Sequence, residues 1–376
     1  MNDAPPVSTD LLDRHDALMA HLAATGKTVQ TLATLPFGRE IVAIQTGGDR
    51  LPAIVLTAGA HATEVEGTLA ALRLIDTLET EHVTYIVPTR DPLGTEGYGA
   101  TLRRAAGTDE PLNTNETIGA LLRRGDVLFD DGALVVAAYG SRAFAHMPRQ
   151  PDWVPWGHHE IYQRLRRHVQ HDPTLGARLN GRNILIPAAA PQIEGCRDFD
   201  RAWTAVGAWG DLLHLNRFFG DITAPVEVTA VNRLLDNVQP GLAIDLHAGT
   251  SDKFWLPYPL PQQDDALSEA VARAMAAAVR AGGYPAATLA KLRAEGGLAN
   301  AAFFTPYIDL GNGVTPYYAD ERGEGSNFMD YCRQFGVAVG TEAGQRAPRA
   351  VRTDMIYRAA LGGIRAWEAA ITDKER

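Results

Sequence analysis

Short apolar runs alternate with segments of helical periodicity along most of the chain. Apolar runs of strand length lie at 39–48, 51–59, 82–89, 242–249 and 335–344. Apolar positions recur at helical spacing over 9–24, 64–78, 265–281 and 353–370. Strands that alternate with helices favour parallel pairing. We therefore predict an α/β fold with a mixed, partly parallel central sheet and helices on both faces.

Two connecting regions add to this picture. A Gly-Gly-Asp turn separates the strands at 39–48 and 51–59, which predicts a hairpin. Residues 100–180 are rich in Arg, Pro, His and Trp and show no long periodic pattern before about residue 159. We interpret this stretch as an insertion, either packed as a lid near the mouth of a site or a surface excursion without a catalytic role. Nothing in it indicates a second domain, so we expect a single catalytic domain over 1–376.

Composition and charge exclude several classes of protein. The chain has 376 residues, of which 45% are hydrophobic, and a net charge of −10, which is typical of a globular protein and argues against nucleic-acid binding. No apolar run approaches the length of a membrane span, about 20 residues. The N-terminus has no basic region followed by an apolar stretch, so we expect a cytoplasmic protein. Two cysteines are too few for a disulfide framework or a zinc ribbon.

Three candidate metal ligands follow two of the predicted strands. His61 lies on the turn after strand 51–59, and Glu64 lies in the first turn of the helix that follows. His247 ends another apolar strand, with Asp245 available as a polar support. Imidazole nitrogen and carboxylate oxygen are zinc ligands, and a catalytic zinc site usually has three protein ligands and a water. We predict one Zn²⁺ per chain. Taken alone, His61 and Glu64 would also fit a turn histidine and a surface glutamate, and His247 would fit a partly buried histidine bonded to a backbone carbonyl.

Glu342 is the candidate catalytic base. It follows the apolar strand at 335–344 at the point where that strand becomes polar. A carboxylate beside the water that a zinc ion activates can accept its proton and pass it to the leaving amine. Taken alone, Glu342 fits a surface charge at a strand end equally well. The shared position of all four residues at strand ends strengthens the joint interpretation.

Other patterns point to no alternative chemistry. His168 and His171 are three residues apart on a predicted helix, but the surrounding segment IYQRLRRHVQHD is strongly basic and favours a solvated face. The chain has no G-x-S-x-G motif for a nucleophilic serine and no glycine-rich phosphate-binding motif.

Several motifs, in order along the chain, resemble the zinc carboxypeptidase superfamily of the carboxypeptidase A type. They are FGREIVAIQTGGDRLPAIVLTAGAHATEVEG, IVPTRDPLGTEGY, LLHLNRFFGD, DLHAG and GSNFMDYCRQFGVAVGTE. The resemblance covers most of the chain except roughly 100–180. It implies the α/β fold of that superfamily and zinc ligation by His61, Glu64 and His247, with Glu342 as general base and acid.

The resemblance also implies residues that bind the substrate. Asn216 and Arg217 would bind its terminal carboxylate, for which the planar guanidinium is suited. An arginine that polarises the scissile carbonyl would be Arg201, with Arg197 as the other choice, and a tyrosine beside the substrate would be Tyr318. An alternative for Arg217 is a structural ion pair.

The chain departs from the family pattern at two places. Asp91 stands where the family usually has Asn. His214 stands where the family has an Asp that supports the first zinc histidine, which leaves that support in question.

The sequence therefore predicts a zinc-dependent hydrolase that cleaves an amide bond next to a free carboxylate, most simply a metallocarboxypeptidase acting on peptides. An amidohydrolase or deacylase of small N-acyl amino acids or specialised metabolites would use the same residues. A non-catalytic zinc-binding module is the third possibility. The sequence specifies neither the natural substrate nor the oligomeric state.

Overall fold

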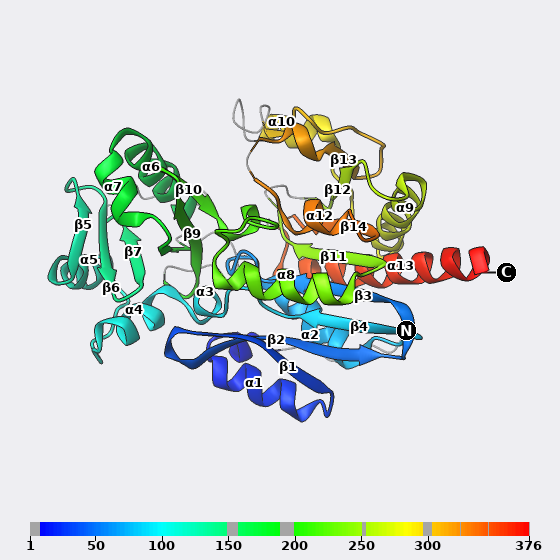
Figure 1. The fold of residues 1–376 in the computed structure, drawn as a ribbon, viewed down its shortest axis with the longest axis horizontal. Coiled ribbons are helices and arrows are strands. Elements are labelled where there is room, and N and C mark those ends of the chain that lie inside the picture. Colours follow the sequence, from blue (N-terminus) through cyan, green and yellow to red (C-terminus); the bar gives the residue numbers. More distant parts are fainter. Residues whose placement is uncertain are drawn as a thin grey trace.

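The protein has an α/β fold in which two six-stranded sheets lie side by side (Figure 1). The computed structural model describes residues 8–148, 157–188, 199–249, 253–295, 303–323, 325–344 and 346–375. None of the helices within these ranges is long and apolar enough to cross a membrane.

The first sheet confirms the predicted mixed architecture. Its order is β1–β2–β4–β3–β11–β14, with β3, β4, β11 and β14 parallel and the β1–β2 and β2–β4 pairs antiparallel. The strands are β1 (Thr28–Leu35), β2 (Arg39–Gly47), β3 (Arg50–Ala58), β4 (His82–Val87), β11 (Leu242–His247) and β14 (Val337–Glu342). Because β3, β11 and β14 are parallel neighbours, their carboxyl ends meet at one edge of the sheet.

Helices cover both faces of this sheet, as predicted. Ile54 and Leu56 belong to a core that includes α2 (Val65–Thr77), α9 (Asp265–Ala281) and α13 (Arg349–Glu375). Val55, which points to the opposite face, belongs to a second core with α8 (Val226–Val238) and α12 (Phe328–Cys332). This alternation is the period-two pattern of a strand buried on both sides.

The remaining elements complete the layer that contains the first sheet. A 3₁₀ turn, η1 (Thr9–Leu12), precedes α1 (His15–Ala24), so the single helix predicted over 9–24 is wrong. Ser8 caps the short turn, and the chain then leaves helical geometry at Arg14 before α1 begins. The other elements of this layer are η2 (Pro36–Gly38), α3 (Pro92–Glu96), η3 (Leu215–Arg217), β12 (Leu256–Leu260), α10 (Leu289–Glu295), β13 (Val314–Tyr318) and η4 (Ala319–Glu321).

The predicted hairpin between the strands at 39–48 and 51–59 is wrong. β2 pairs with β4, which lies between β2 and β3. The two glycines of the turn make room for this arrangement: a Cβ on Gly47 would lie 2.2 Å from the carbonyl oxygen of His82, and one on Gly48 would lie 2.2 Å from that of Glu81. The Gly-Gly pair therefore admits the backbone that leads into β4.

The second sheet contains most of the stretch that we interpret as an insertion. Its order is β10–β9–β8–β7–β6–β5, and it lies to the left in Figure 1. Its elements are α4 (Tyr98–Ala106), α5 (Asn115–Arg124), β5 (Asp126–Asp130), β6 (Val135–Tyr139), β7 (Arg142–His146), α6 (Gly157–His171), α7 (Pro173–Leu179), β8 (Asn183–Pro187), β9 (Ala202–Ala208) and β10 (Asp211–His214). The layer extends to residue 214, and the single-domain organisation stays a prediction.

Buried charges join the two layers. Arg142 on β7 donates to Glu227 on α8 at 2.9 Å, and the side-chain amide of Asn183 on β8 donates to the same oxygen at 2.7 Å. All three side chains are buried. Because a buried ion pair is costly to break, this contact fixes the second sheet against the first.

Asp91 lies near the boundary between the layers, and its charge costs stability. Its Oδ1 accepts a hydrogen bond from the Gly94 amide at 2.9 Å and caps α3. Oδ2 is buried, and the Thr204 side chain and the Gly94 amide lower the pKa of the carboxyl in part. Burial outweighs them and raises the pKa of Asp91 from 3.8 to about 6. The ionised carboxylate is therefore disfavoured in the folded protein.

Replacing Asp91 with Asn should stabilise the protein above pH 6. The amide keeps the capping oxygen and adds no charge. Because the folded pKa lies above the unfolded one, the wild type loses stability as the pH rises from about 4 to about 6. One pKa unit corresponds to about 1.4 kcal/mol, so the gain is on the order of 2–3 kcal/mol at pH 7 and vanishes below about pH 4. Denaturant unfolding of both proteins at pH 3.5 and pH 7 measures this, and equal stability at pH 7 would contradict it.

Candidate metal centre

The turn that presents His61 and Glu64 depends on close backbone packing. Gly59 follows β3 with φ of +62°, and a Cβ there would lie 2.6 Å from the Thr89 hydroxyl. The amide of Glu64 then donates to the His61 carbonyl at 2.9 Å, just before α2 begins. At Gly67 a Cβ would lie 2.4 Å from the Leu246 carbonyl. The start of α2 therefore packs directly against the end of β11, where His247 lies.

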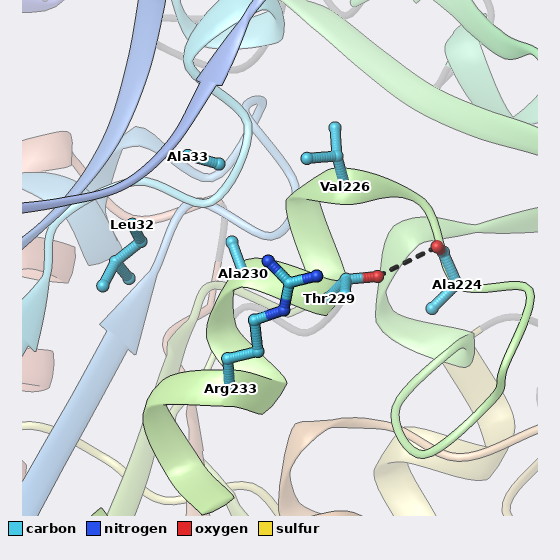
Figure 2. Close-up of a pocket in the computed structure, with 7 residues that line it drawn as sticks. All are labelled: Leu32, Ala33, Ala224, Val226, Thr229, Ala230 and Arg233. Atoms are coloured by element: carbon cyan, nitrogen blue, oxygen red, sulfur yellow. Dashed lines mark hydrogen bonds between the residues drawn. The ribbon is translucent and has the colours of Figure 1, made fainter. Parts of the chain in front are cut away.

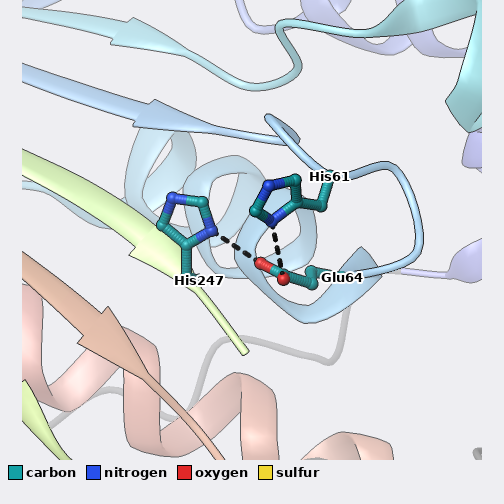
Figure 3. A group of neighbouring side chains, drawn as sticks. All are labelled: His61, Glu64 and His247. Carbon is teal, nitrogen blue, oxygen red and sulfur yellow. Dashed lines mark hydrogen bonds and ion pairs between the residues drawn. The ribbon is translucent and has the colours of Figure 1, made fainter. Parts of the chain in front are cut away.

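The structure brings the three predicted metal ligands together (Figure 3). Oε1 of Glu64 lies 2.8 Å from Nδ1 of His61, and Oε2 lies 2.7 Å from Nδ1 of His247. One ligand atom from each residue lies within 4.8 Å of the other two. Two imidazole nitrogens and a carboxylate oxygen at this separation form a donor set that zinc accepts.

A carboxylate supports His247 from behind. Nε2 of His247 lies 2.7 Å from Oδ2 of Asp245, which is fully buried. Arg90 donates to both oxygens of Asp245 at 2.9 Å, and the Thr57 hydroxyl donates to one of them at 2.8 Å. A carboxylate so held fixes the imidazole with Nδ1 facing Glu64, as metal-binding histidines require.

His61 has a different support. Its Nε2 lies 3.0 Å from Nδ1 of His214, at the end of β10 in the second sheet. His214, which stands where the family has an Asp, therefore contacts the candidate ligand His61 directly. The ring of Trp203, on β9, lies 6.1 Å from that of His61. The second sheet thus forms one side of the candidate metal site made by His61, Glu64 and His247.

The charges around the cluster favour a cation at its centre. Burial opposes charge on every group here, yet Asp245 and Glu64 together raise the pKa of His247 well above its usual value. For Glu64, burial is likewise outweighed by His61 and His247, which lower its pKa. Opposite charges at short range favour each other's ionised forms. The residues present therefore fit a divalent metal ion.

Glu342 lies beside His247 in the sheet. The two residues are paired in the register of β11 and β14, and the Ala343 amide donates to the His247 carbonyl at 3.1 Å. Oε2 of Glu342 is buried without a hydrogen-bond partner among the described residues. A Cβ on Gly249 would lie 2.5 Å from this oxygen. Burial, with the nearby Glu64 and Asp245 charges, raises the pKa of Glu342 to about 8.

Arg217 acts on the same site through its charge. Its Nη1 donates to the Asn216 carbonyl at 2.8 Å. Its positive charge lowers the pKa of His61 and opposes the rise in the pKa of Glu342. The guanidinium is therefore close enough to influence both a candidate ligand and the candidate base.

Asn216 is buried behind His247. Its Oδ1 accepts from the Phe328 amide at 3.1 Å, and its Nδ2 lies 3.3 Å from both Oδ2 of Asp245 and Nε2 of His247. These contacts turn the side chain toward the support of the metal cluster. A role in substrate binding stays a prediction.

Two further predicted substrate-binding residues lie in other surroundings. Arg201 donates to Asp13 at 2.8 Å and to its neighbour's carbonyl, and its side chain is buried. Tyr318 is 44% exposed at the end of β13. Arg197 lies outside the described residues. Substrate roles for Arg201 and Tyr318 stay predictions.

Besides Arg90 and Thr57, which hold Asp245, sequence reasoning missed Tyr307 and Arg322 near the site. Tyr307 is buried, and burial, opposed by the charges of Arg322 and Arg217, raises its pKa to about 12. The charge of Arg322 also contributes to the low pKa of His214. No local pattern marks either residue, because each lies in an irregular segment between elements.

A surface pocket of about 270 Å³ lies elsewhere, between β1 and α8 (Figure 2). It is lined by Leu32, Ala33, Ala224, Val226, Thr229, Ala230 and Arg233. This lining has no acid, histidine or cysteine and includes none of the predicted site residues. The chemistry therefore places the candidate site at the metal cluster and not at this pocket.

Comparisons with known proteins find similarity in structure alone. No family model matches the chain, and no curated protein matches its sequence. A structure from Shewanella denitrificans OS217, described as a candidate metallopeptidase, is 12% identical with a TM-score of 0.50, and the match covers 97% of this chain and 98% of that one.

Two further matches have lower scores, and we draw no argument from them. The carboxypeptidase A of Helicoverpa armigera is 12% identical with a TM-score of 0.45, covering 96% of this chain and 75% of that one. A metallo-carboxypeptidase from Burkholderia cenocepacia is 11% identical with a TM-score of 0.46, covering 95% and 69%. The chain therefore shares the α/β fold of a candidate metallopeptidase over nearly its whole length, which confirms at the level of the fold the resemblance expected from its motifs.

Proposed function

We propose that this protein is a zinc-dependent hydrolase that cleaves an amide bond next to a free carboxylate, acting as a metallocarboxypeptidase on peptides. The observation that supports this most is the convergence of His61, Glu64 and His247 beside Glu342 at one edge of the sheet. Three ligands from two strand ends and a buried carboxylate with an unpartnered oxygen are the groups that metal-assisted hydrolysis needs.

The residues divide the chemistry between them. His61, Glu64 and His247 would hold one zinc ion, which lowers the pKa of water toward 7 and polarises a carbonyl. Glu342 takes the proton from the attacking water and returns it to the departing nitrogen. Its burial supports this role, because burial raises the affinity of the carboxylate for a proton, which it must hold between the two transfers.

Arg217 is proposed to bind the terminal carboxylate of the substrate. Its charge already acts on Glu342 and His61, so a carboxylate bound there lies close to the reacting groups. A guanidinium binds such a group through two parallel hydrogen bonds. The preference for substrates with a free terminal carboxylate would thus arise from Arg217.

Replacing Arg217 with Ala should raise KM for substrates with a free carboxylate by about 10–100-fold, since a hydrogen bond to a charged group contributes roughly 1.5–3 kcal/mol. Substrates with the same sequence and a terminal amide should be affected much less. Steady-state kinetics on matched acid and amide substrates measures the difference. Equal effects on both would show that Arg217 has a structural role.

A hydrolysis screen tests the function itself. Purified protein loaded with zinc is given peptides with free and amidated C-termini, together with N-acyl amino acids, before and after treatment with a chelator. We expect release of C-terminal residues from the free peptides and loss of that activity with chelation. Cleavage of N-acyl amino acids alone would indicate a deacylase, and bound zinc with no hydrolysis of any substrate would contradict the proposal.

A further inference from the structure

The two candidate histidine ligands are held by chemically different groups. Nε2 of His247 lies 2.7 Å from the carboxylate of Asp245. Nε2 of His61 lies 3.0 Å from an imidazole nitrogen, Nδ1 of His214. The cluster therefore has an anionic support on one side and an imidazole support on the other.

A metal on His61 would set the hydrogen on each ring. Nδ1 of His61 faces Glu64 at 2.8 Å and would bind the metal. Nε2 of His61 would then bear the hydrogen and donate it to Nδ1 of His214. As the acceptor, His214 would have its own hydrogen on Nε2 and be neutral.

Two aromatic rings hold His214 in place. Its ring centroid lies 4.8 Å from that of His61 and 5.5 Å from that of Trp203. His214 and Trp203 both belong to the second sheet, on β10 and β9. The imidazole that contacts Nε2 of His61 is therefore positioned by that sheet.

We propose that His214 is a positioning residue that holds His61 toward Glu64 as a neutral hydrogen-bond acceptor, and that its lack of negative charge keeps zinc affinity below the value that a carboxylate would give. The inference rests on the proposed zinc site. A carboxylate behind a histidine ligand raises the basicity of that ligand. Asp245 does so for His247, whereas His214 orients His61 without adding charge.

Four proteins test this: the wild type and the variants His214→Asn, His214→Asp and His214→Ala. The oxygen of Asn takes the place of Nδ1 as a neutral acceptor, and Asp has nearly the same shape with a negative charge. The zinc dissociation constant of each is measured at one pH by competition with a fluorescent chelator, without substrate. Thermal unfolding of the metal-free proteins controls for folding.

We expect Asp to bind zinc about tenfold or more tightly than Asn, Asn to bind close to the wild type, and Ala to bind about 10–100-fold more weakly than the wild type. Equal affinities for Asp and Asn would overturn the role of charge. Wild-type affinity in the Ala variant would overturn the positioning role. The comparison of the Asn and Ala variants tests that role even if the Asp variant fails to fold. A wild type that binds no zinc would overturn the proposed function and this inference together.

Discussion

Replacing Glu342 with Gln should lower kcat by at least about 10²–10⁴-fold while zinc content and folding stay unchanged. General acid–base catalysis typically contributes that much, and here one carboxyl would serve both proton transfers. Gln keeps the size of the side chain and its place at the end of β14 but cannot accept the proton of water. Zinc should stay bound because Glu342 is not one of the three clustered candidate ligands.

The structure gives a reason for the size of this effect. Oε2 of Glu342 is buried and unpartnered in the described part of the chain, and the pKa of the carboxyl is raised to about 8. A carboxylate in such surroundings is a stronger base than one in water. Arg217 already opposes this rise in pKa, and a bound cation would lower the pKa further toward neutrality, where proton transfer in both directions is efficient.

Kinetics on whichever substrate the screen identifies would measure the effect, with zinc assayed in parallel. Glu269→Gln is a suitable control, since the side chain of Glu269 on α9 is 41% exposed and pairs with Arg273 at 2.7 Å on the same helix. Near wild-type kcat in the Glu342 variant would refute its role as base. Loss of zinc would instead identify it as a ligand and call Glu64 into question.

The strand-end residues could be predicted because their signals are local. Each strand near His61, His247 and Glu342 is a mostly apolar run that becomes polar at its carboxyl end, and parallel strands place such ends at one edge. The bounds of β3, α2, β11 and α9 were accordingly predicted to within about two residues. The same local reasoning wrongly predicted a hairpin at Gly47 and Gly48. These glycines make room for β4, a strand that follows later in the chain.

The second sheet could not be predicted from the same signals. Its strands are only four to seven residues long, and most pair antiparallel with the next strand in order. Such runs cannot be told from buried loop segments by periodicity alone. The residues that support the candidate metal ligands were predicted only in part. Arg90 and Asp245 pair although 155 residues separate them in the sequence, and no local pattern indicates such a contact.

Removing one metal ligand gives the second large effect. We expect about one zinc per wild-type chain and no stoichiometric zinc in His61→Ala, because two protein ligands would remain where a catalytic site needs three. His171→Ala is the control, since this histidine is exposed on α6, where its Nδ1 contacts the Arg167 carbonyl. It should bind zinc as the wild type does.

The loss should also appear in stability. A ligand that binds only the folded state stabilises it by about 4 kcal/mol at a free concentration one thousand times the dissociation constant. Added zinc should therefore raise the Tm of the wild type and of His171→Ala but not that of His61→Ala. Metal analysis after dialysis, followed by thermal unfolding with and without zinc, distinguishes loss of the site from loss of the fold. Stoichiometric zinc in His61→Ala would place the metal elsewhere, with His168 and His171 as the next candidates. A metal-free variant that unfolds like the metal-free wild type would show that His61 is needed for metal binding and not for folding.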